Sequence, residues 1–529
     1  MTGSTKSTAD ETRTESAGGF LGAVERIGNK LPDPFWLFVI LSGVVVIASV
    51  IGNRIGMAAT DPGSGETIEV ESLLTAENLS RMVTDAVKNF ITFPPLGVIL
   101  AVMLGVAIAE YTGLLSALIR AMVSRVGPKT LTFMVALAGV TGSVASDAIY
   151  VIIIPLGAMA FHAVGRSPIV GAMVAFAASS AGFNASLILN ITDLLLAGIS
   201  TSAAQLVDAS YTVSPLANIF FVIPSAVVLS LIITAVTELY VDKKARQLIN
   251  HDEVSFEHSS DSDSPNAGEE PSLALTPTET KGLIGTGLTL LAFLVVFFVL
   301  LFWGASPFAR PEEGFMASPL IQAIAVPITL AFFVTGLAYG LITGSITSSS
   351  DIPDMMAKGL QSLLPMLVLF FAVSQFLAWF QWSNLGLWTA IRGAELLQRW
   401  DLPAVVLFAA FVAMVALLNL LITSGSAQWA LMAPVVVPMM MYVGVSPEVT
   451  QMLYRIGDSP TNIITPMSPY FALALTFLQR YYKKAGVGTL MSLALPYSMS
   501  MLAGWFIFFL VWYLLGIPLG PGAPMHYGG

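Results

Sequence analysis

The stretch YRIGDSPTNIITPMSP, residues 454–469, places two charges and three prolines inside an apolar segment near the end of the chain. A continuous helix through it is disfavoured, because proline lacks the N–H group that the helical ladder uses. A break there frees main-chain carbonyl and amide groups at membrane depth. Arg455 and Asp458 each cost about 2.5–3.5 kcal/mol at the centre of a membrane helix. The stretch therefore predicts a broken membrane helix that carries a polar site.

The composition agrees with a chain that lies mostly in a membrane. Of the 529 residues, 55% are hydrophobic and 11% are charged, against roughly 25% charged in soluble domains. Mean hydropathy is +0.79. A crossing helix takes about 20 residues, so about ten crossings fit, and long continuous apolar runs disfavour a barrel. The sequence predicts an all-α polytopic membrane protein. It excludes a soluble enzyme, a nucleic-acid binder and a disordered chain.

Several kinds of chemistry have no motif in this sequence. The chain has no cysteine and four scattered histidines, so we expect no disulfide, thiolate or zinc site. It has no phosphate-binding loop and no readable serine–histidine–aspartate arrangement. We therefore expect a protein that is not an enzyme, that holds no cofactor other than a bound ion, and that draws its energy from an ion gradient.

Apolar runs divide the chain into nine expected spans and two interrupted stretches. The spans lie near residues 35–52, 95–109, 169–200, 218–240, 283–303, 319–346, 359–380, 449–478 and 490–515. The interrupted stretches, about 131–163 and 403–443, carry glycine and small polar residues halfway along. Irregular backbone inside a membrane must be buried in protein or line water, so we expect two re-entrant hairpins.

These boundaries give five parts. They are a cytoplasmic tail with an interfacial helix (1–34), a first membrane half (35–240), an acidic cytoplasmic linker (241–281), a second membrane half (282–517) and a C-terminal tail (518–529). With the N-terminus in the cytoplasm, most of the clustered Lys and Arg residues fall in cytoplasmic loops, as the positive-inside rule requires. The C-terminus then lies outside, in the periplasm.

One pattern occurs twice, at an offset of 279 residues. The corresponding pairs include Ala148 and Ala427, Pro155 and Pro434, Pro168 and Pro447, and Ser180 and Ser459. Both copies read hairpin tip, proline, turn and broken helix. Inverted repeats with discontinuous helices are the architecture of secondary transporters, whose site lies at the midplane. We therefore expect inverted-topology repeats, with the site between them.

The second break offers ligands for two kinds of ion. Asp458, Asn462 and freed carbonyl groups suit a small cation, and Arg455 suits an anionic group of the substrate. The alternative is an ion pair between Arg455 and Asp458 that only ties two helices together.

The first half offers a matching break near Asn184, followed by Asp193. A carboxyl group in a low-dielectric site can titrate near neutrality, so Asp193 is the candidate for binding a proton or a substrate amine. A helix-end residue at the outer interface is the alternative for Asp193.

The hairpin tips supply hydroxyl groups, a carboxylate and exposed backbone. Ser146 and Asp147 belong to the first tip, and Ser424-Gly425-Ser426 to the second. Capping of the hairpin arms is compatible with a role in binding. Trp429 follows the second tip and suits stacking on a flat ligand or core packing equally. Asn419 is a lone amide in an apolar arm, where it also suits a hydrogen bond between helices.

Four motifs together resemble the AbgT family of p-aminobenzoyl-glutamate transporters. They are residues 145–150, 181–186 with Asp193, 424–429 and 454–462. The resemblance runs from about residue 21 to residue 515. It implies a dimer of nine-helix protomers with two hairpins in the inner membrane of a bacterium. It also implies import of p-aminobenzoyl-glutamate, or export of sulfonamide antimetabolites, driven by the proton or sodium gradient.

Further residue roles follow from the resemblance alone. It implies that the transport path includes Asp193, Ser426, Trp429, Pro447, Arg455, Asp458 and Pro466. It implies a sodium site made by Asn419, Gly425, Asp458 and Asn462.

Three other functions compete with this one. A sodium–dicarboxylate carrier shares the hairpin plan, but its tips would read Ser-Asn-Thr, whereas this chain has Ser146-Asp147-Ala148 and Ser426-Ala427-Gln428. An ion channel could use the same broken helices, and saturable, gradient-dependent flux would exclude it. An intramembrane enzyme would need paired catalytic residues, which we do not find.

Overall fold

The structure is a computed structural model that describes residues 32–62, 65–124, 126–145, 148–248, 274–310, 312 and 314–528. The expected interfacial helix, most of the acidic linker and the tip residues Ser146 and Asp147 lie outside these ranges. Nearly every described element is a helix.

The elements of the first half run as follows: α2 (Pro34–Arg54), β1 (Ala58–Thr60), β2 (Thr67–Glu69), α3 (Ala76–Thr84), α4 (Ala86–Ile91), α5 (Pro94–Tyr111), α6 (Leu114–Val123), α7 (Leu131–Thr141), the 3-10 helix η1 (Gly142–Ala145), α8 (Ala148–Ala163), α9 (Pro168–Phe176), the π-helical turn η2 (Ala177–Ala181), α10 (Ile191–Ala204), α11 (Ile219–Val236), the π-helical turn η3 (Thr237–Val241) and α12 (Asp242–Leu248).

The elements of the second half run as follows: α13 (Pro277–Phe302), the 3-10 helix η5 (Phe315–Ala317), α14 (Pro319–Gln322), α15 (Ala325–Thr343), α16 (Asp351–Ser362), α17 (Leu364–Trp382), α18 (Leu385–Trp400), α19 (Ala404–Asn419), α20 (Gly425–Tyr442), α21 (Pro447–Asp458), the 3-10 helix η6 (Ser459–Ile464), α22 (Pro469–Tyr481) and α23 (Val487–Leu514).

Seven helices among the described residues are long and apolar enough to cross a membrane. They are Pro34–Arg54, Pro94–Tyr111, Ile219–Gln247, Pro277–Phe302, Ala325–Thr343, Leu364–Trp382 and Val487–Leu514. Six shorter apolar helices accompany them, and they include both arms of the first interrupted stretch, the first arm of the second, and the two helices of the first break. The all-α polytopic architecture is thus confirmed, whereas the count of nine spans and the two hairpins stay predictions.

Two parts of the fold differ from the expected spans. Residues 58–69 form a two-stranded antiparallel sheet in which Ala59 pairs with Ile68; strands of three residues are too short to give a readable alternation. The expected span 359–380 begins inside a different helix, because α16 ends at Ser362 and α17 begins anew at Leu364. Pro365 stands in the first turn of α17, where its missing N–H is not needed.

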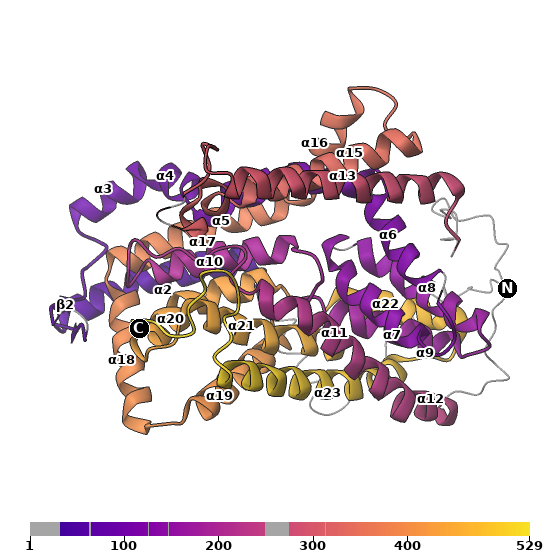
Figure 1. Cartoon of the computed structure of the whole chain (residues 1–529). Coiled ribbons are helices and arrows are strands. Elements are labelled where there is room, and N and C mark those ends of the chain that lie inside the picture. The colour runs from indigo at the N-terminus through magenta and orange to yellow at the C-terminus, as the bar shows by residue number, and fades with distance from the viewer. Residues whose placement is uncertain are drawn as a thin grey trace, which may run out of the picture.

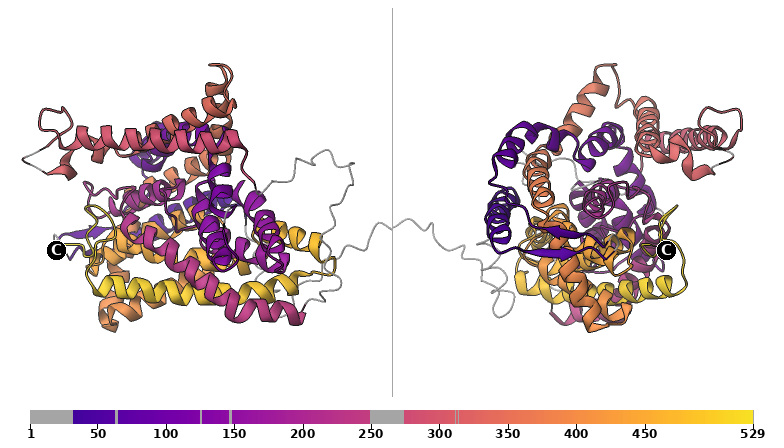
Figure 2. Two further views of the ribbon diagram at one scale, coloured as in Figure 1. Left: turned by 45° about the vertical axis from the view of Figure 1, so that its right-hand side comes forward. Right: turned by 90° about the vertical axis from the view of Figure 1, so that its left-hand side faces the viewer.

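The long helices form a bundle in which different helices lie on opposite sides. Figures 1 and 2 show α13 and α15 along one side and α23 along the opposite side. Small residues let α5 and α15 approach closely: a Cβ on Gly105 would lie 2.2 Å from the Thr329 carbonyl oxygen, and one on Gly336 would lie 2.6 Å from the Ala109 nitrogen. Such contacts are typical of helix packing in membranes, where burial of apolar area drives little association.

The two breaks meet inside the bundle. Helices α9 and α21 begin at Pro168 and Pro447, 279 residues apart, and each runs into an irregular turn, η2 or η6. These two turns pack against each other. Helix α10, which follows η2 in the chain, and helix α20, which precedes α21, also pack together. The polar residues of both halves are therefore brought to one place.

Candidate functional site

A buried ion pair joins the two halves of the chain. Arg455 Nη2 lies 2.5 Å from Asp193 Oδ1, and the two side chains are 1% and 7% exposed. Arg455 comes from α21, and Asp193 from the first turn of α10, where it forms a capping box with Asn190. Asp193 therefore caps a helix and also neutralises the arginine. The partner of Arg455 is thus not Asp458, and the alternative of an ion pair three residues apart is wrong.

Asn184 links this ion pair to Asp458. The Asn184 carbonyl oxygen accepts a hydrogen bond of 2.9 Å from Arg455 Nη2, and its Nδ2 donates one of 2.9 Å to Asp458 Oδ2. All three residues are almost completely buried. Arg455 and Asp458 of α21 and Asp193 of α10 are thereby joined in one chain of polar contacts.

Asn419 marks a point where oxygen atoms converge. Its Nδ2 donates to the Asp458 carbonyl oxygen at 2.6 Å, to Thr461 Oγ1 at 2.8 Å and to Asn462 Oδ1 at 3.0 Å. The Asn419 Oδ1 atom is buried and makes no hydrogen bond to any described residue. Rotating this amide by 180° would exchange its nitrogen and oxygen, so that four oxygen atoms would face one another. That donor set fits a hard cation such as sodium.

A cavity of about 170 Å³ opens beside these residues. It is lined by Phe183, Asn184, Thr192, Leu195, Leu196, Gly425, Ser426, Tyr454 and Asp458. The start of α20 is close to Asp458, because a Cβ on Gly425 would lie 3.1 Å from Asp458 Oδ2. The cavity thus has apolar walls with a carboxylate and an amide at one side.

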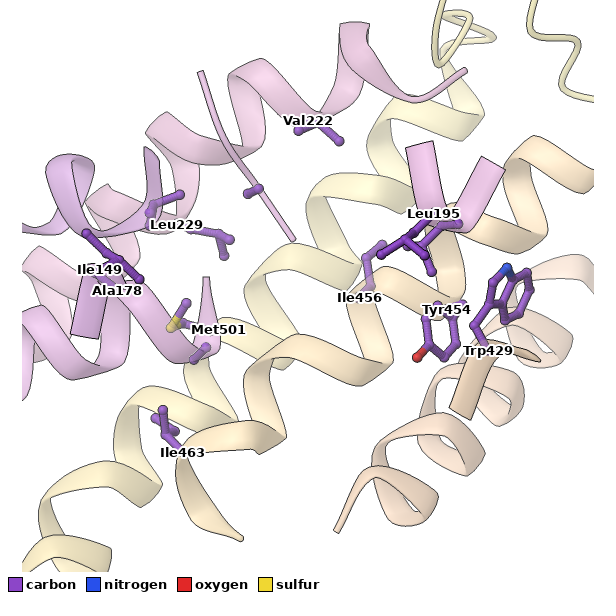
Figure 3. Packing of buried hydrophobic residues seen from close by; sticks show 14 of the residues in the cluster. Ile149, Ala178, Leu195, Val222, Leu229, Trp429, Tyr454, Ile456, Ile463 and Met501 are labelled. Atoms are coloured by element: carbon purple, nitrogen blue, oxygen red, sulfur yellow. The ribbon is translucent and has the colours of Figure 1, made fainter. Parts of the chain in front are cut away.

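Trp429 lies behind this cavity rather than in its wall. Its indole Nε1 donates to Ser200 Oγ at 3.0 Å, and its ring lies tilted against that of Tyr454, with 4.5 Å between the ring centroids. Figure 3 shows the two rings side by side near Leu195. Ser200 in turn donates to Gln451 Oε1 at 2.7 Å. The buried side chain of Trp429 therefore supports Tyr454, and of these two rings only that of Tyr454 lines the cavity.

Comparison with known proteins decides the family of this chain. The sequence model of the AbgT transporter family matches residues 19–527. The p-aminobenzoyl-glutamate transport protein of Escherichia coli is 36% identical over 510 residues, covering 96% of this chain and 97% of that protein. The chain belongs to the AbgT transporter family. A sodium–dicarboxylate carrier is thereby set aside.

Two solved structures resemble this AbgT transporter. The YdaH transporter of Alcanivorax borkumensis is 38% identical with a TM-score of 0.85, over 93% of this chain and 100% of that one. MtrF of Neisseria gonorrhoeae, whose structure is described as illuminating a class of antimetabolite efflux pumps, is 41% identical with a TM-score of 0.87, over 96% and 100%. Both likenesses extend over nearly the whole fold.

The other predicted residues of this AbgT transporter fall into three groups. Ser426 lies in the cavity wall. Pro447 opens α21 and Pro466 follows η6, so these prolines lie at the ends of the broken segment and outside the cavity wall. Ser146 and Asp147 belong to the part of the chain that the structure does not describe.

Several residues of the site were missed by sequence reasoning. Phe183, Thr192 and Tyr454 line the cavity, and Thr461 faces the Asn419 amide. Tyr454 and Thr461 belong to the stretch 454–469, but aromatic and hydroxyl side chains are common in membrane helices. Only the three-dimensional arrangement sets them apart.

Proposed function

We propose that this AbgT transporter is an ion-gradient-coupled secondary transporter of p-aminobenzoyl-glutamate, of sulfonamide antimetabolites, or of both. The observation that carries the proposal is the buried pair of Arg455 and Asp193 at the junction of the two broken helices. A buried charge inside a membrane protein is costly and usually functional. The E. coli relative is a p-aminobenzoyl-glutamate transport protein and the N. gonorrhoeae relative belongs to a class of antimetabolite efflux pumps, which supports this class of cargo.

The pair suggests how cargo and proton exchange. A carboxylate of the cargo replaces Asp193 on Arg455, whose planar guanidinium matches a carboxylate with two hydrogen bonds. Asp193, once displaced from Arg455, is then the proposed site of the coupling proton. Without cargo, the Asp193 carboxylate therefore occupies the position on Arg455 that a carboxylate of the cargo takes when it binds.

The cavity wall suggests how the aromatic ring is held. Tyr454 and Phe183 both line the cavity, and Trp429 backs Tyr454 at 4.5 Å. Offset or tilted ring pairs are favourable beyond their burial. Tyr454 therefore contacts the ring of the cargo, while Trp429 keeps Tyr454 in position. The cavity is smaller than the roughly 300–1,000 Å³ of sites for drug-sized ligands, so cargo enters only when the surrounding helices part.

The remaining architecture belongs to the same proposal. It comprises nine spans and two re-entrant hairpins in inverted repeats, a homodimer, and sodium as an ion held by Asn419, Thr461, Asn462 and Asp458. The protein lies in the inner membrane, with its N-terminus in the cytoplasm and its C-terminus in the periplasm. The start of both α9 and α21 at equivalent prolines supports the repeat.

Flux into liposomes tests the function. Purified protein is reconstituted, and uptake of p-aminobenzoyl-glutamate and of a sulfonamide is measured under a proton gradient and a sodium gradient imposed separately. Saturable flux of at least one cargo that follows one of the gradients is expected. Arg455→Gln should abolish it for the glutamylated cargo. Non-saturable flux of ions without cargo would instead indicate a channel.

A further inference from the structure

A second cavity lies on the outside of the helix bundle, and it shares no lining residue with the cavity described above. It is a groove of about 560 Å³ between the end of α11, with its continuation η3 and α12, and the middle of α23. Its walls include Leu239, Tyr240, Leu495 and Met499. Leu239 is 71% exposed and Met499 is 54% exposed. The helical segment Ile219–Gln247, which contains α11, and helix α23 are both long enough to span a membrane, so we infer that these exposed side chains face lipid.

One amine is fixed at the end of this groove. Pro496 in α23 has no N–H, so the Ser492 carbonyl oxygen four residues earlier loses its helical donor. Lys244 Nζ donates to that oxygen at 2.9 Å and lies 5.3 Å from the centre of the Tyr240 ring. An ammonium group has three N–H donors. Lys244 is therefore held in place with two donors left for another group.

The acidic residues near Lys244 in the sequence form ion pairs with arginines and do not neutralise its charge. Glu238 pairs with Arg166 at 2.8 Å, and Asp242 pairs with Arg246 at 2.9 Å. Among the residues that the structure describes, Lys244 has no carboxylate within 4.0 Å. The fixed ammonium therefore faces the groove as an uncompensated positive charge.

We propose that this groove binds one anionic phospholipid, with an acyl chain on the wall formed by Leu239 and Met499 and the phosphate on Lys244. Basic pockets between membrane helices are a recognised kind of site for anionic lipid headgroups. An apolar wall, a lipid-facing position and a fixed cation at one end match the three parts of such a lipid. The proposal does not depend on the cargo or on the coupling ion.

Lipid binding to the detergent-purified, delipidated full chain tests the proposal. Phosphatidylglycerol and phosphatidylcholine with the same acyl chains are compared by native mass spectrometry and by the shift in melting temperature that each lipid causes. Wild type should bind phosphatidylglycerol preferentially. Lys244→Gln should weaken that binding about fivefold, as loss of one basic contact to an anionic lipid implies. Lys243→Gln, with the same charge loss on the neighbouring exposed residue, should change it little.

Further variants and ligands distinguish a bound phospholipid from another occupant of the groove. Lys244→Gln also loses the bond to Ser492, so the lipid-induced shift is compared rather than the melting temperature itself, and Lys244→Arg should keep the preference. Equal binding of the two lipids by wild type, or unchanged binding by Lys244→Gln, would overturn the proposal. So would an equal shift from inorganic phosphate alone. If phosphatidylglycerol bound only after deletion of the acidic residues 249–273, that segment of the chain would be the occupant instead.

Discussion

At the scale of single residues, variants can test the cation site proposed at the Asn419 amide. Thr461→Val removes one of the oxygen atoms that meet at this amide, so the increase in melting temperature caused by sodium should fall by at least half. Thr465→Val is the matched control, because its hydroxyl is equally buried but donates to the Leu420 carbonyl oxygen. Loss of the sodium effect in both variants, or in neither, would contradict the assignment.

Arg455 and Tyr454 should divide recognition of the cargo between them. Arg455→Lys loses the bidentate contact and should weaken a glutamylated ligand by about 2–4 kcal/mol, or roughly 30- to 1,000-fold, and a neutral sulfonamide less. Tyr454→Leu removes a ring contact worth about 0.5–1.5 kcal/mol and should weaken both ligands by similar factors. Calorimetry in detergent measures both. Equal losses for the two ligands in Arg455→Lys would refute the carboxylate contact.

These residue roles show where sequence reasoning stops. Arg455, Asp458 and Asp193 could be singled out because charges in apolar segments are costly. Their pairing could not, because Asp193 comes from the other half of the chain and no local pattern connects it to α21. The sequence leaves Trp429 open between ligand and core, and only its contacts with Ser200 and Tyr454 decide between them.

At the scale of elements, the contact between α5 and α15 depends on glycine. Gly105→Ala would place a methyl group 2.2 Å from the Thr329 carbonyl oxygen, so it should destabilise the protein by about 1–3 kcal/mol. Gly97→Ala, in the same helix and with no atom within 4 Å of its Cβ, should be neutral or slightly stabilising. Thermal unfolding in detergent compares the two, and equal effects would show that the helices can shift apart without cost.

Helix starts were predictable where a cap and a proline coincide. Asp33 accepts a hydrogen bond from the Phe35 nitrogen and Pro34 begins α2, as a polar cap followed by proline indicates. The small sheet at 58–69 and the break at Leu363 were not predictable, because a three-residue strand and a one-residue interruption leave no periodic signal.

At the scale of the whole molecule, the ion pair at the site ties the two halves together. Breaking it from one side, by Asp193→Asn or Arg455→Gln, should cost about 3–5 kcal/mol, because the remaining charge stays buried without its partner. The double variant should cost clearly less than the sum of the two single changes. Melting curves of the four proteins in detergent give the coupling, and strict additivity would show that the pair is not formed in solution.

The buried pair also bears on the electrical behaviour of transport. Without cargo, the charges of Arg455 and Asp193 cancel. This binding centre therefore carries no net charge from the pair when it moves during transport. If a dicarboxylate cargo binds Arg455 and Asp193 takes up one proton, the loaded centre differs from the empty one by one negative charge. A neutral sulfonamide does not change the net charge of this centre. The two cargoes should therefore respond differently to a potassium diffusion potential in the same liposomes, since each charge that crosses is worth about 2.3 kcal/mol for each 100 mV. Equal responses would contradict the exchange of carboxylates on Arg455.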